Sequence, residues 1–183
     1  MRQIFRTANS PLRIGCSFLG MAFLAYTGFS LMHVFASARI MNHQATCATN
    51  VKQLTLGLLQ YSQDWDEKLP PAQQWATLSS TYGHPSPKAA VWHCPDASSP
   101  YSYAFNTALS GLSYSKLDSP AQTVCLFEAD ATLWNAIGGT QQLAKAPRHP
   151  WGPHYGFADG HVKVSRVNQM SWQPFLIPTE KTP

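Results

Sequence analysis

Imidazole and carboxylate side chains gather near the C-terminal end of the sequence. Within thirteen residues the chain contains His149, His154, Asp159 and His161. Three imidazole nitrogens and one carboxylate oxygen are a legitimate tetrahedral ligand set for Zn²⁺. A structural interpretation competes with zinc binding, because Asp159 lies in a turn-forming Asp159-Gly160 pair, where its carboxylate can accept bonds from nearby backbone N–H groups and from His149. We expect the structural role.

No further motif makes this cluster an enzyme active site. The sequence contains no Gly-x-Ser-x-Gly or Ser-x-x-Lys nucleophile motif, no phosphate loop and no paired zinc knuckles. His93 adjoins Cys94, but neighbouring side chains of an extended chain point in opposite directions and do not form a nucleophile–base pair. We therefore predict a protein without catalysis and without a bound cofactor.

A long helix is the first element that must position these residues. Apolar side chains recur at helical steps of three and four and form one stripe, at Cys47, Val51, Leu54, Leu58, Tyr61 and Trp65. No proline lies between Ala38 and Leu69, and Pro70-Pro71 ends the pattern. We predict one helix over about residues 14–66, whose second half buries this stripe against a sheet.

Four runs of residues predict the strands of that sheet. They are Tyr101–Asn106, Thr123–Glu128, Tyr155–Ala158 and His161–Val167. Asp159-Gly160, between the last two runs, predicts a type I′ hairpin in which both residues have positive φ. Alternation in the last run predicts that Val162 and Val164 are buried. The predicted fold class is α+β, with a long N-terminal helix packed on a small antiparallel sheet.

The charges of the chain are distributed unevenly. Ile14–Ala38 contains no Asp, Glu, Lys or Arg and follows three arginines, Arg2, Arg6 and Arg13. As a helix this stretch is roughly 37 Å long, enough to cross a hydrocarbon core of about 30 Å. From Arg39 onward the chain has ten basic and nine acidic residues, which argues against a nucleic-acid-binding domain. The basic flank predicts a cytoplasmic N-terminus and an extracytoplasmic domain.

The predicted organisation follows from this span. Its parts are a basic flank (1–13), a transmembrane helix (14–38) and a domain (39–183) comprising the rest of the helix, a loop-rich segment (70–100) with a short helix near Trp75–Ser80, the sheet (about 101–167) and a tail (168–183). His33 is expected at the membrane interface. Cleavage after Ala38 by a signal peptidase remains the alternative, although the apolar stretch exceeds the roughly 7–15 residues usual in signal peptides.

The order of several motifs resembles a bacterial family. In chain order the motifs are Cys47, Asn50-Val51-Lys52-Gln53, Tyr61-Ser62-Gln63-Asp64, Leu69-Pro70-Pro71, Cys94-Pro95, Ser102–Asn106, Ser119-Pro120, and His149 followed after nine residues by Asp159-Gly160. They resemble prepilin-type proteins with a C-terminal His–nine residues–Asp-Gly motif, relatives of type IV pilins and type II secretion pseudopilins. The resemblance implies a pilin-like fold, anchoring in the inner membrane, contacts with other pilin-like subunits through the N-terminal helix, and fold-defining roles for His149, Asp159 and Gly160.

The chain departs from that family at the processing site. Members carry a glycine before the prepilin-peptidase cut and a glutamate at the fifth position of the processed chain, where this sequence has Pro11 and Cys16. We therefore expect no processing by prepilin peptidase. Entry into a filament and a stand-alone anchored protein both remain open.

Calcium binding is a further possibility that the resemblance brings, because some pseudopilins hold Ca²⁺ in an acidic loop. The nearest equivalents in this chain are Glu128 and Asp130. Two carboxylates are few for an ion that takes six or more oxygen ligands, so we predict no calcium site.

Three of the four cysteines belong to the predicted domain, and Cys16 lies in the span. Because disulfides persist outside the cytoplasm and three thiols form at most one pair, one cysteine must remain free. Cys47 lies on the buried helix stripe, and Cys94 lies in a loop that can cross the helix. We predict the pair Cys47–Cys94 with Cys125 as a buried thiol, and Cys47–Cys125 is the alternative.

Trp75, Trp92 and Trp134 support a different class of function. Aromatic side chains in loops can present a carbohydrate-binding surface, and a secreted or anchored binding domain for a carbohydrate or a metal ion is the alternative to a structural protein. We expect at least two of the three tryptophans to be buried instead.

Overall fold

The computed structural model describes residues 11–83, 86–143 and 148–165 and divides the chain into two units, Met1–Met41 and Asn42–Pro183. The helix α1 (Pro11–Asp64) runs through both, close to the predicted 14–66. From Leu19 onward, where its side chains are described, α1 is long and apolar enough to cross a membrane. Its large apolar side chains are exposed, at Leu19, Met21, Phe23, Leu24, Tyr26, Phe29, Leu31, Met32, Val34 and Phe35. The basic flank up to Ser10, the side chain of Cys16 and the predicted tail lie outside the described residues.

The second unit begins with the amphipathic part of α1. Five of the six predicted stripe residues are buried, at Cys47, Val51, Leu54, Leu58 and Tyr61. The prediction is wrong for Trp65, whose side chain is 56% exposed. Trp65 follows the last residue of α1, Asp64, and stacks on Tyr61 with ring centroids 5.6 Å apart. Asp66 and Glu67, directly after it, have positive φ.

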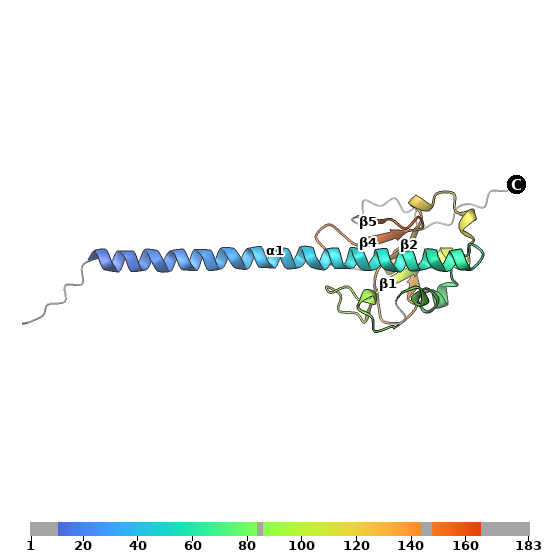
Figure 1. The fold of residues 1–183 in the computed structure, drawn as a ribbon, viewed down its shortest axis with the longest axis horizontal. Helices are drawn as coiled ribbons and strands as arrows, with labels where there is room; N and C mark the ends of the chain where they lie inside the picture. The colour runs from blue at the N-terminus through green and yellow to red at the C-terminus, as the bar shows by residue number, and fades with distance from the viewer. Residues whose placement is uncertain (1–10, 84–85, 144–147, 166–183) are drawn as a thin grey trace, which may run out of the picture. The chain divides into compact units, whose positions relative to one another are not determined.

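A five-stranded sheet packs against this part of α1, in the α+β, pilin-like arrangement expected from the sequence (Figure 1). The strands are β1 (Tyr101–Asn106), β2 (Val124–Ala131), β3 (Ile137–Gly138), β4 (His154–Phe157) and β5 (Val162–Val164), in the order β3-β1-β2-β4-β5. Four strands pair antiparallel, as predicted. The two-residue β3 pairs parallel to β1 and makes the sheet mixed, because the chain returns past β2 before it reaches that edge.

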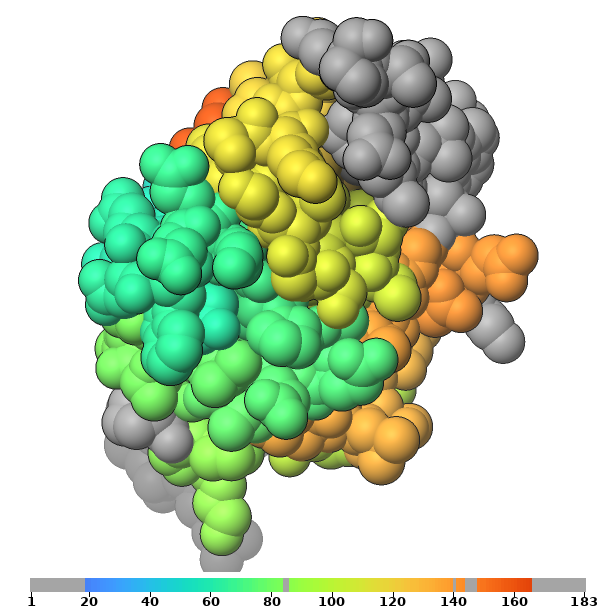
Figure 2. All heavy atoms as spheres, turned by 90° about the vertical axis from the view of Figure 1, so that its right-hand side faces the viewer, coloured from blue at the N-terminus to red at the C-terminus, as the bar shows by residue number. Residues whose placement is uncertain are grey.

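Short helices occupy the connections. They are α2 (Trp75–Ser79) and the 3-10 helices η1 (Ala72–Gln74), η2 (Ser80–Tyr82), η3 (Ala90–Trp92), η4 (Thr107–Leu109), η5 (Tyr114–Lys116), η6 (Pro120–Gln122) and η7 (Thr140–Gln142). The turn after α1 is held by the loop before η5, since Leu69 N–H donates to Leu112 O at 2.9 Å and Tyr114 N–H donates to Glu67 O at 2.6 Å. Figure 2 shows these two segments side by side, in green and yellow.

The β4–β5 hairpin forms, but its turn differs from the predicted type I′ turn. Gly160 has φ 90°, whereas Asp159 is not among the residues with positive φ. Phe157 O accepts from Gly160 N–H at 2.8 Å and Asp159 Oδ1 accepts from His161 N–H at 3.0 Å, so the turn is centred on Ala158-Asp159 with Gly160 in the left-handed position after it.

A second prediction for this hairpin, the burial of Val162 and Val164, is wrong in part because β5 lies at the edge of the sheet. β5 is an outer strand of the sheet, and Val164 is 37% exposed rather than buried. Val162 is half-buried and packs against the core. Alternation of apolar and polar residues therefore overestimates burial on a three-residue edge strand.

Gly156 allows α1 to lie directly on the sheet. A Cβ atom at this position in β4 would overlap Thr55 Oγ1 and would lie 3.1 Å from Val51 Cγ1, and both of these residues belong to the buried face of α1. A side chain at Gly156 would therefore force the helix and the sheet apart.

The substitution Gly156→Ala tests this contact. We expect the free energy of unfolding to fall by about 1–3 kcal/mol, the usual effect of overpacking a core, in urea unfolding of the detergent-solubilised full chain. Gly139→Ala is the matched control, because a Cβ there meets no atom within 4 Å and the backbone has an extended φ of −137°. Equal stability of the two variants would contradict the close approach of helix and sheet.

Candidate functional site

The structure divides the four residues considered as zinc ligands into two pairs. His149 and His154 are 2% and 3% exposed and lie beside each other, with ring centroids 5.1 Å apart. Asp159 and His161 pair with one another on the β4–β5 turn, where Asp159 Oδ1 lies 2.6 Å from His161 Nδ1. The predicted bond between His149 and Asp159 is also absent from the interactions of the described residues. The turn satisfies the Asp159 carboxylate locally, which leaves His149 to other partners.

Glu128 is the partner of both buried histidines. Its side chain has no exposed surface, and it lies on β2, where the pairing of Phe127 with Tyr155 places it opposite His154. His154 Nδ1 lies 2.7 Å from Glu128 Oε1, and His149 Nε2 lies 3.4 Å from the same oxygen. One buried carboxylate oxygen therefore joins two histidines from the C-terminal motif.

The environment of Glu128 keeps the carboxyl group ionised. Burial raises its pKa, but hydrogen bonds from His149 and His154, together with the charge of those rings, lower it by more. The pKa of Glu128 consequently lies below its ordinary value of about 4.5. A buried carboxylate with two imidazole donors is the usual solution to the desolvation of a charge.

A second carboxylate extends the cluster toward the surface. Asp96 Oδ2 lies 3.3 Å from His149 Nδ1, and Asp96 Oδ1 lies 2.6 Å from His43 Nδ1 on α1. His43 and Asp96 are partly exposed, whereas His149 is buried. The row His43–Asp96–His149–Glu128–His154 thus alternates imidazoles and carboxylates from the surface to the core.

Sequence reasoning missed His43 and Asp96. His43 lies four residues before Cys47, one helical turn along the same face, which is a signal that could have indicated its position. Asp96 carries no comparable signal, because its place depends on how the loop after Cys94 crosses α1.

The two carboxylates considered for calcium have different partners. Glu128 is occupied by the two histidines, whereas Asp130 is 51% exposed and forms an ion pair with Arg148. Arg148 also donates to Ala129 O at 2.7 Å, so it is bound to the end of β2 beside Asp130. The Asp130 carboxylate is therefore already paired with a cation, the Arg148 guanidinium.

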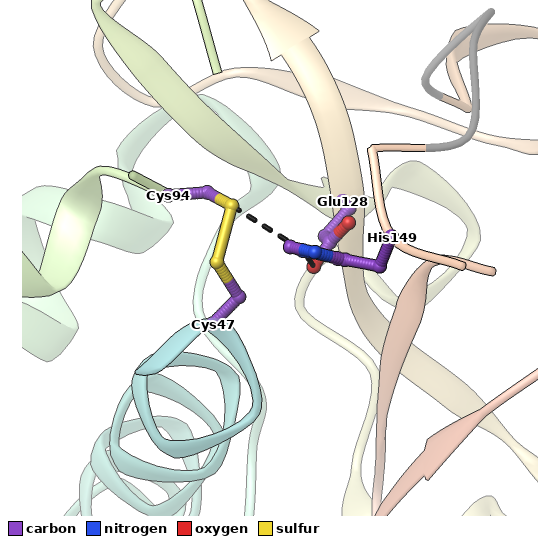
Figure 3. A group of neighbouring side chains, drawn as sticks. All are labelled: Cys47, Cys94, Glu128 and His149. Atoms are coloured by element: carbon purple, nitrogen blue, oxygen red, sulfur yellow. Dashed lines mark hydrogen bonds and ion pairs between the residues drawn. A yellow bond between two sulfur atoms is a disulfide. The ribbon is translucent and has the colours of Figure 1, made fainter. Parts of the chain in front are cut away.

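A disulfide joins Cys47 to Cys94, the partners preferred from the sequence, with Cα atoms 5.3 Å apart (Figure 3). It lies directly against the buried histidine, since Cys94 Sγ is 3.4 Å from His149 Nε2. Cys125 is a buried free thiol whose Sγ donates to Gly156 O at 3.3 Å, and burial raises its pKa to about 12. The disulfide therefore belongs to the same cluster as Glu128 and His149, whereas Cys125 does not.

Trp75, Trp92 and Trp134, which were considered for a carbohydrate-binding surface, belong to the core or pack against it. Trp75 and Trp92 are buried, and Trp134 packs on Trp92 with ring centroids 4.6 Å apart. The hollow beside them has a volume of about 10 Å³, enough for about one water molecule and far too small for a sugar ring. Trp75 Nε1 donates to Ala136 O at 2.8 Å, which satisfies its polar atom inside the domain.

Fold and cluster define an α+β domain that continues a long apolar helix and is fastened by one disulfide beside a buried His–Glu–His group. Comparison of the chain with family models, with curated proteins and with solved structures finds no match. The function must therefore be argued from the residues and the geometry.

Removal of the disulfide should destabilise the domain strongly. The crosslink spans a sequence separation of 47, for which the chain-entropy model gives about 4 kcal/mol. We expect the double variant C47S/C94S to lose roughly this free energy of unfolding in urea, while C125S, which can keep a donor to Gly156 O, loses much less. Similar losses of unfolding free energy in C47S/C94S and C125S would show that the disulfide contributes little beyond the loss of a buried thiol.

The depressed pKa of Glu128 predicts an acid dependence of stability. Because the unfolded chain binds this proton more readily than the folded chain, the stabilisation is present above the ordinary pKa of about 4.5 and is lost as pH falls through the lower folded value. We expect E128Q to have a lower melting temperature at pH 7 and a flatter dependence between about pH 5 and 3. The control E67Q changes an exposed carboxylate and should keep the pH dependence of the wild type. An unchanged pH dependence in E128Q would contradict the assignment.

Proposed function

We propose that this chain is a membrane-anchored, pilin-like structural protein of the bacterial cell envelope and that it performs no catalysis. The exposed apolar part of α1 carries the proposal, since its large side chains from Leu19 to Phe35 are exposed in the part of the chain that the structure describes. A surface of this kind is stable in a bilayer or against the helices of other subunits, and not in water.

The orientation of the chain is proposed from charge and from the disulfide. Arg2, Arg6 and Arg13 precede the span, and basic residues favour the cytoplasmic side of a membrane. The Cys47–Cys94 disulfide suits an oxidising compartment. Both arguments favour a single-pass inner-membrane protein with its domain outside the cytoplasm.

The partners we propose are the lipid bilayer and other pilin-like subunits. The motif order from Cys47 to Gly160 resembles prepilin-type proteins, and the long helix packed on a small sheet agrees with that resemblance. Pro11 and Cys16 stand where processing requires glycine and glutamate, so we propose that the chain keeps its membrane span uncleaved and is an accessory subunit of a type IV pilus or type II secretion-like assembly, with a stand-alone anchored protein as the alternative.

Fractionation of cells that express the full chain tests the anchor. We expect the protein in carbonate-washed membranes, digestible by protease added to spheroplasts, and with its encoded N-terminal region intact by mass spectrometry. The double variant L24R/F29R should leave the membrane fraction, because two charges in the span are costly in hydrocarbon. The control L133R, at an exposed position of the domain, should remain membrane-bound.

Two results would overturn parts of this proposal. A mature N-terminus at Arg39 would show that the span is a cleaved signal peptide. A methylated N-terminus inside the span would show that prepilin peptidase processes the chain despite Pro11 and Cys16.

A further inference from the structure

Four buried side chains with metal-binding atoms converge beside α1. They are Cys47 from α1, Cys94 from the loop after η3, Glu128 from β2 and His149 from the segment before β4 (Figure 3). One ligand atom from each lies within 4.8 Å of those of the other three, and all four residues are buried. Two sulfurs, one imidazole nitrogen and one carboxylate oxygen are a donor set that Zn²⁺ takes in proteins.

The spacing of the donor atoms matches a tetrahedral ion. Zinc–ligand bonds of about 2.0–2.3 Å place neighbouring ligand atoms about 3.3–3.8 Å apart. His149 Nε2 lies 3.4 Å from Cys94 Sγ and 3.4 Å from Glu128 Oε1. The two sulfurs, which are bonded to each other in the disulfide, must separate to occupy two corners of the tetrahedron.

The groups around these four residues are those that orient zinc ligands. A histidine that binds zinc through one ring nitrogen usually presents the other to a carboxylate, and His149 Nδ1 lies 3.3 Å from Asp96 Oδ2. Glu128 Oε1 is itself held by His154 Nδ1 at 2.7 Å. Asp96 and His154 are therefore the neighbours that could orient His149 and Glu128 as ligands.

An unpartnered atom supplies an independent indication of a ligand. Within the described residues Glu128 Oε2 is fully buried and has no hydrogen-bond partner. A buried carboxylate oxygen without a donor is rare, because its desolvation is not compensated. A cation bound to the Glu128 carboxylate would compensate it.

We propose that, when the Cys47–Cys94 disulfide is reduced, Cys47, Cys94, His149 and Glu128 bind one Zn²⁺ ion. The same two cysteines thus fasten the loop to α1 in both oxidation states, through a covalent bond when oxidised and through the metal when reduced. The inference does not depend on membrane anchoring or on assembly with other subunits.

Reduction of the Cys47–Cys94 disulfide can proceed by thiol–disulfide exchange, in which atoms and electrons balance. A protein dithiol transfers two electrons and two protons to the disulfide, which becomes two thiols while the dithiol becomes a disulfide. Zn²⁺ then displaces the two thiol protons and binds the thiolates. Since the chain is synthesised with thiols, the zinc form also arises directly whenever folding precedes oxidation.

Metal titration of the full chain in detergent tests the proposal. The disulfide is reduced with a water-soluble phosphine, which takes the oxygen of a water molecule to become a phosphine oxide and, unlike a dithiol, does not chelate zinc strongly. We expect the reduced chain to bind one equivalent of Zn²⁺ in competition with a chromophoric chelator. Co²⁺ in its place should give thiolate-to-cobalt charge-transfer bands and the d–d bands of a tetrahedral site.

Matched variants separate this site from adventitious binding. H149A and E128Q should weaken zinc binding roughly tenfold or more, and C47S/C94S should abolish the charge-transfer bands. H161N and C125S should bind like the wild type, because neither residue belongs to the four-residue group. The oxidised wild-type chain should bind no zinc at this site.

The comparison of oxidised and reduced wild type keeps the test decisive if a variant fails to fold. Less than one equivalent of zinc bound by the reduced, folded chain would overturn the proposal. Equal binding by the oxidised and reduced chains, or Co²⁺ spectra without thiolate bands, would also overturn it, since the cysteines would then not be ligands.

Discussion

A carboxylate without exposed surface, Glu128, lies on a central strand of the sheet, and two histidines lie beside one of its oxygens, Oε1. Moving such a charge out of water costs several kcal/mol unless hydrogen-bond donors replace the solvent. His154 supplies the nearest donor from the adjacent strand, and His149 supplies a second from the segment before it. Because these donors come from different parts of the chain, the ionised carboxylate forms its bonds only when β2, β4 and the preceding segment occupy their native positions.

The same cluster fastens the part of the fold that has the fewest regular hydrogen bonds. Residues 70–100 form only α2 and short 3-10 helices, with no strand among those described. The end of this segment is attached to α1 by the Cys47–Cys94 disulfide and by Asn50 Nδ2, which donates to His93 O at 3.0 Å. Ser102 Oγ accepts from Cys94 N–H at 2.8 Å and carries the attachment on to β1. Covalent closure thus replaces secondary structure as the constraint on this loop.

Local patterns in the sequence predicted the elements better than they predicted the site. The stripe from Cys47 to Tyr61 and the bounds of β1 follow from periodicity and β-propensity, which are properties of neighbouring residues. Trp65 was assigned to the stripe because its spacing fits, but α1 ends at Asp64, directly before it, and its side chain is exposed. β3 is too short to have a pattern of its own.

Contacts between distant residues explain why the site was harder to predict. Glu128 was considered as a calcium ligand because Asp130 follows it, yet its partners come from β4 and from the segment before β4. Only the pairing of β2 with β4 indicates that Glu128 faces His154, and no spacing in the sequence gives that register. The Asp159-Gly160 pair was identified correctly as a turn, whereas its carboxylate binds His161 locally and leaves His149 to the interior.

One helix, α1, runs through both units of the chain, and its apolar side chains are distributed differently in each. Between Leu19 and Met41 apolar side chains are exposed all around α1, whereas from Cys47 onward they are buried on one face. In the second unit the opposite face carries polar residues such as Gln53, Gln60 and Gln63, which are exposed to water. A helix that is apolar all round needs an apolar medium, and one that is apolar on one side needs a packing partner. The sheet supplies that partner for the second unit, and in the first unit α1 is long and apolar enough to cross a membrane.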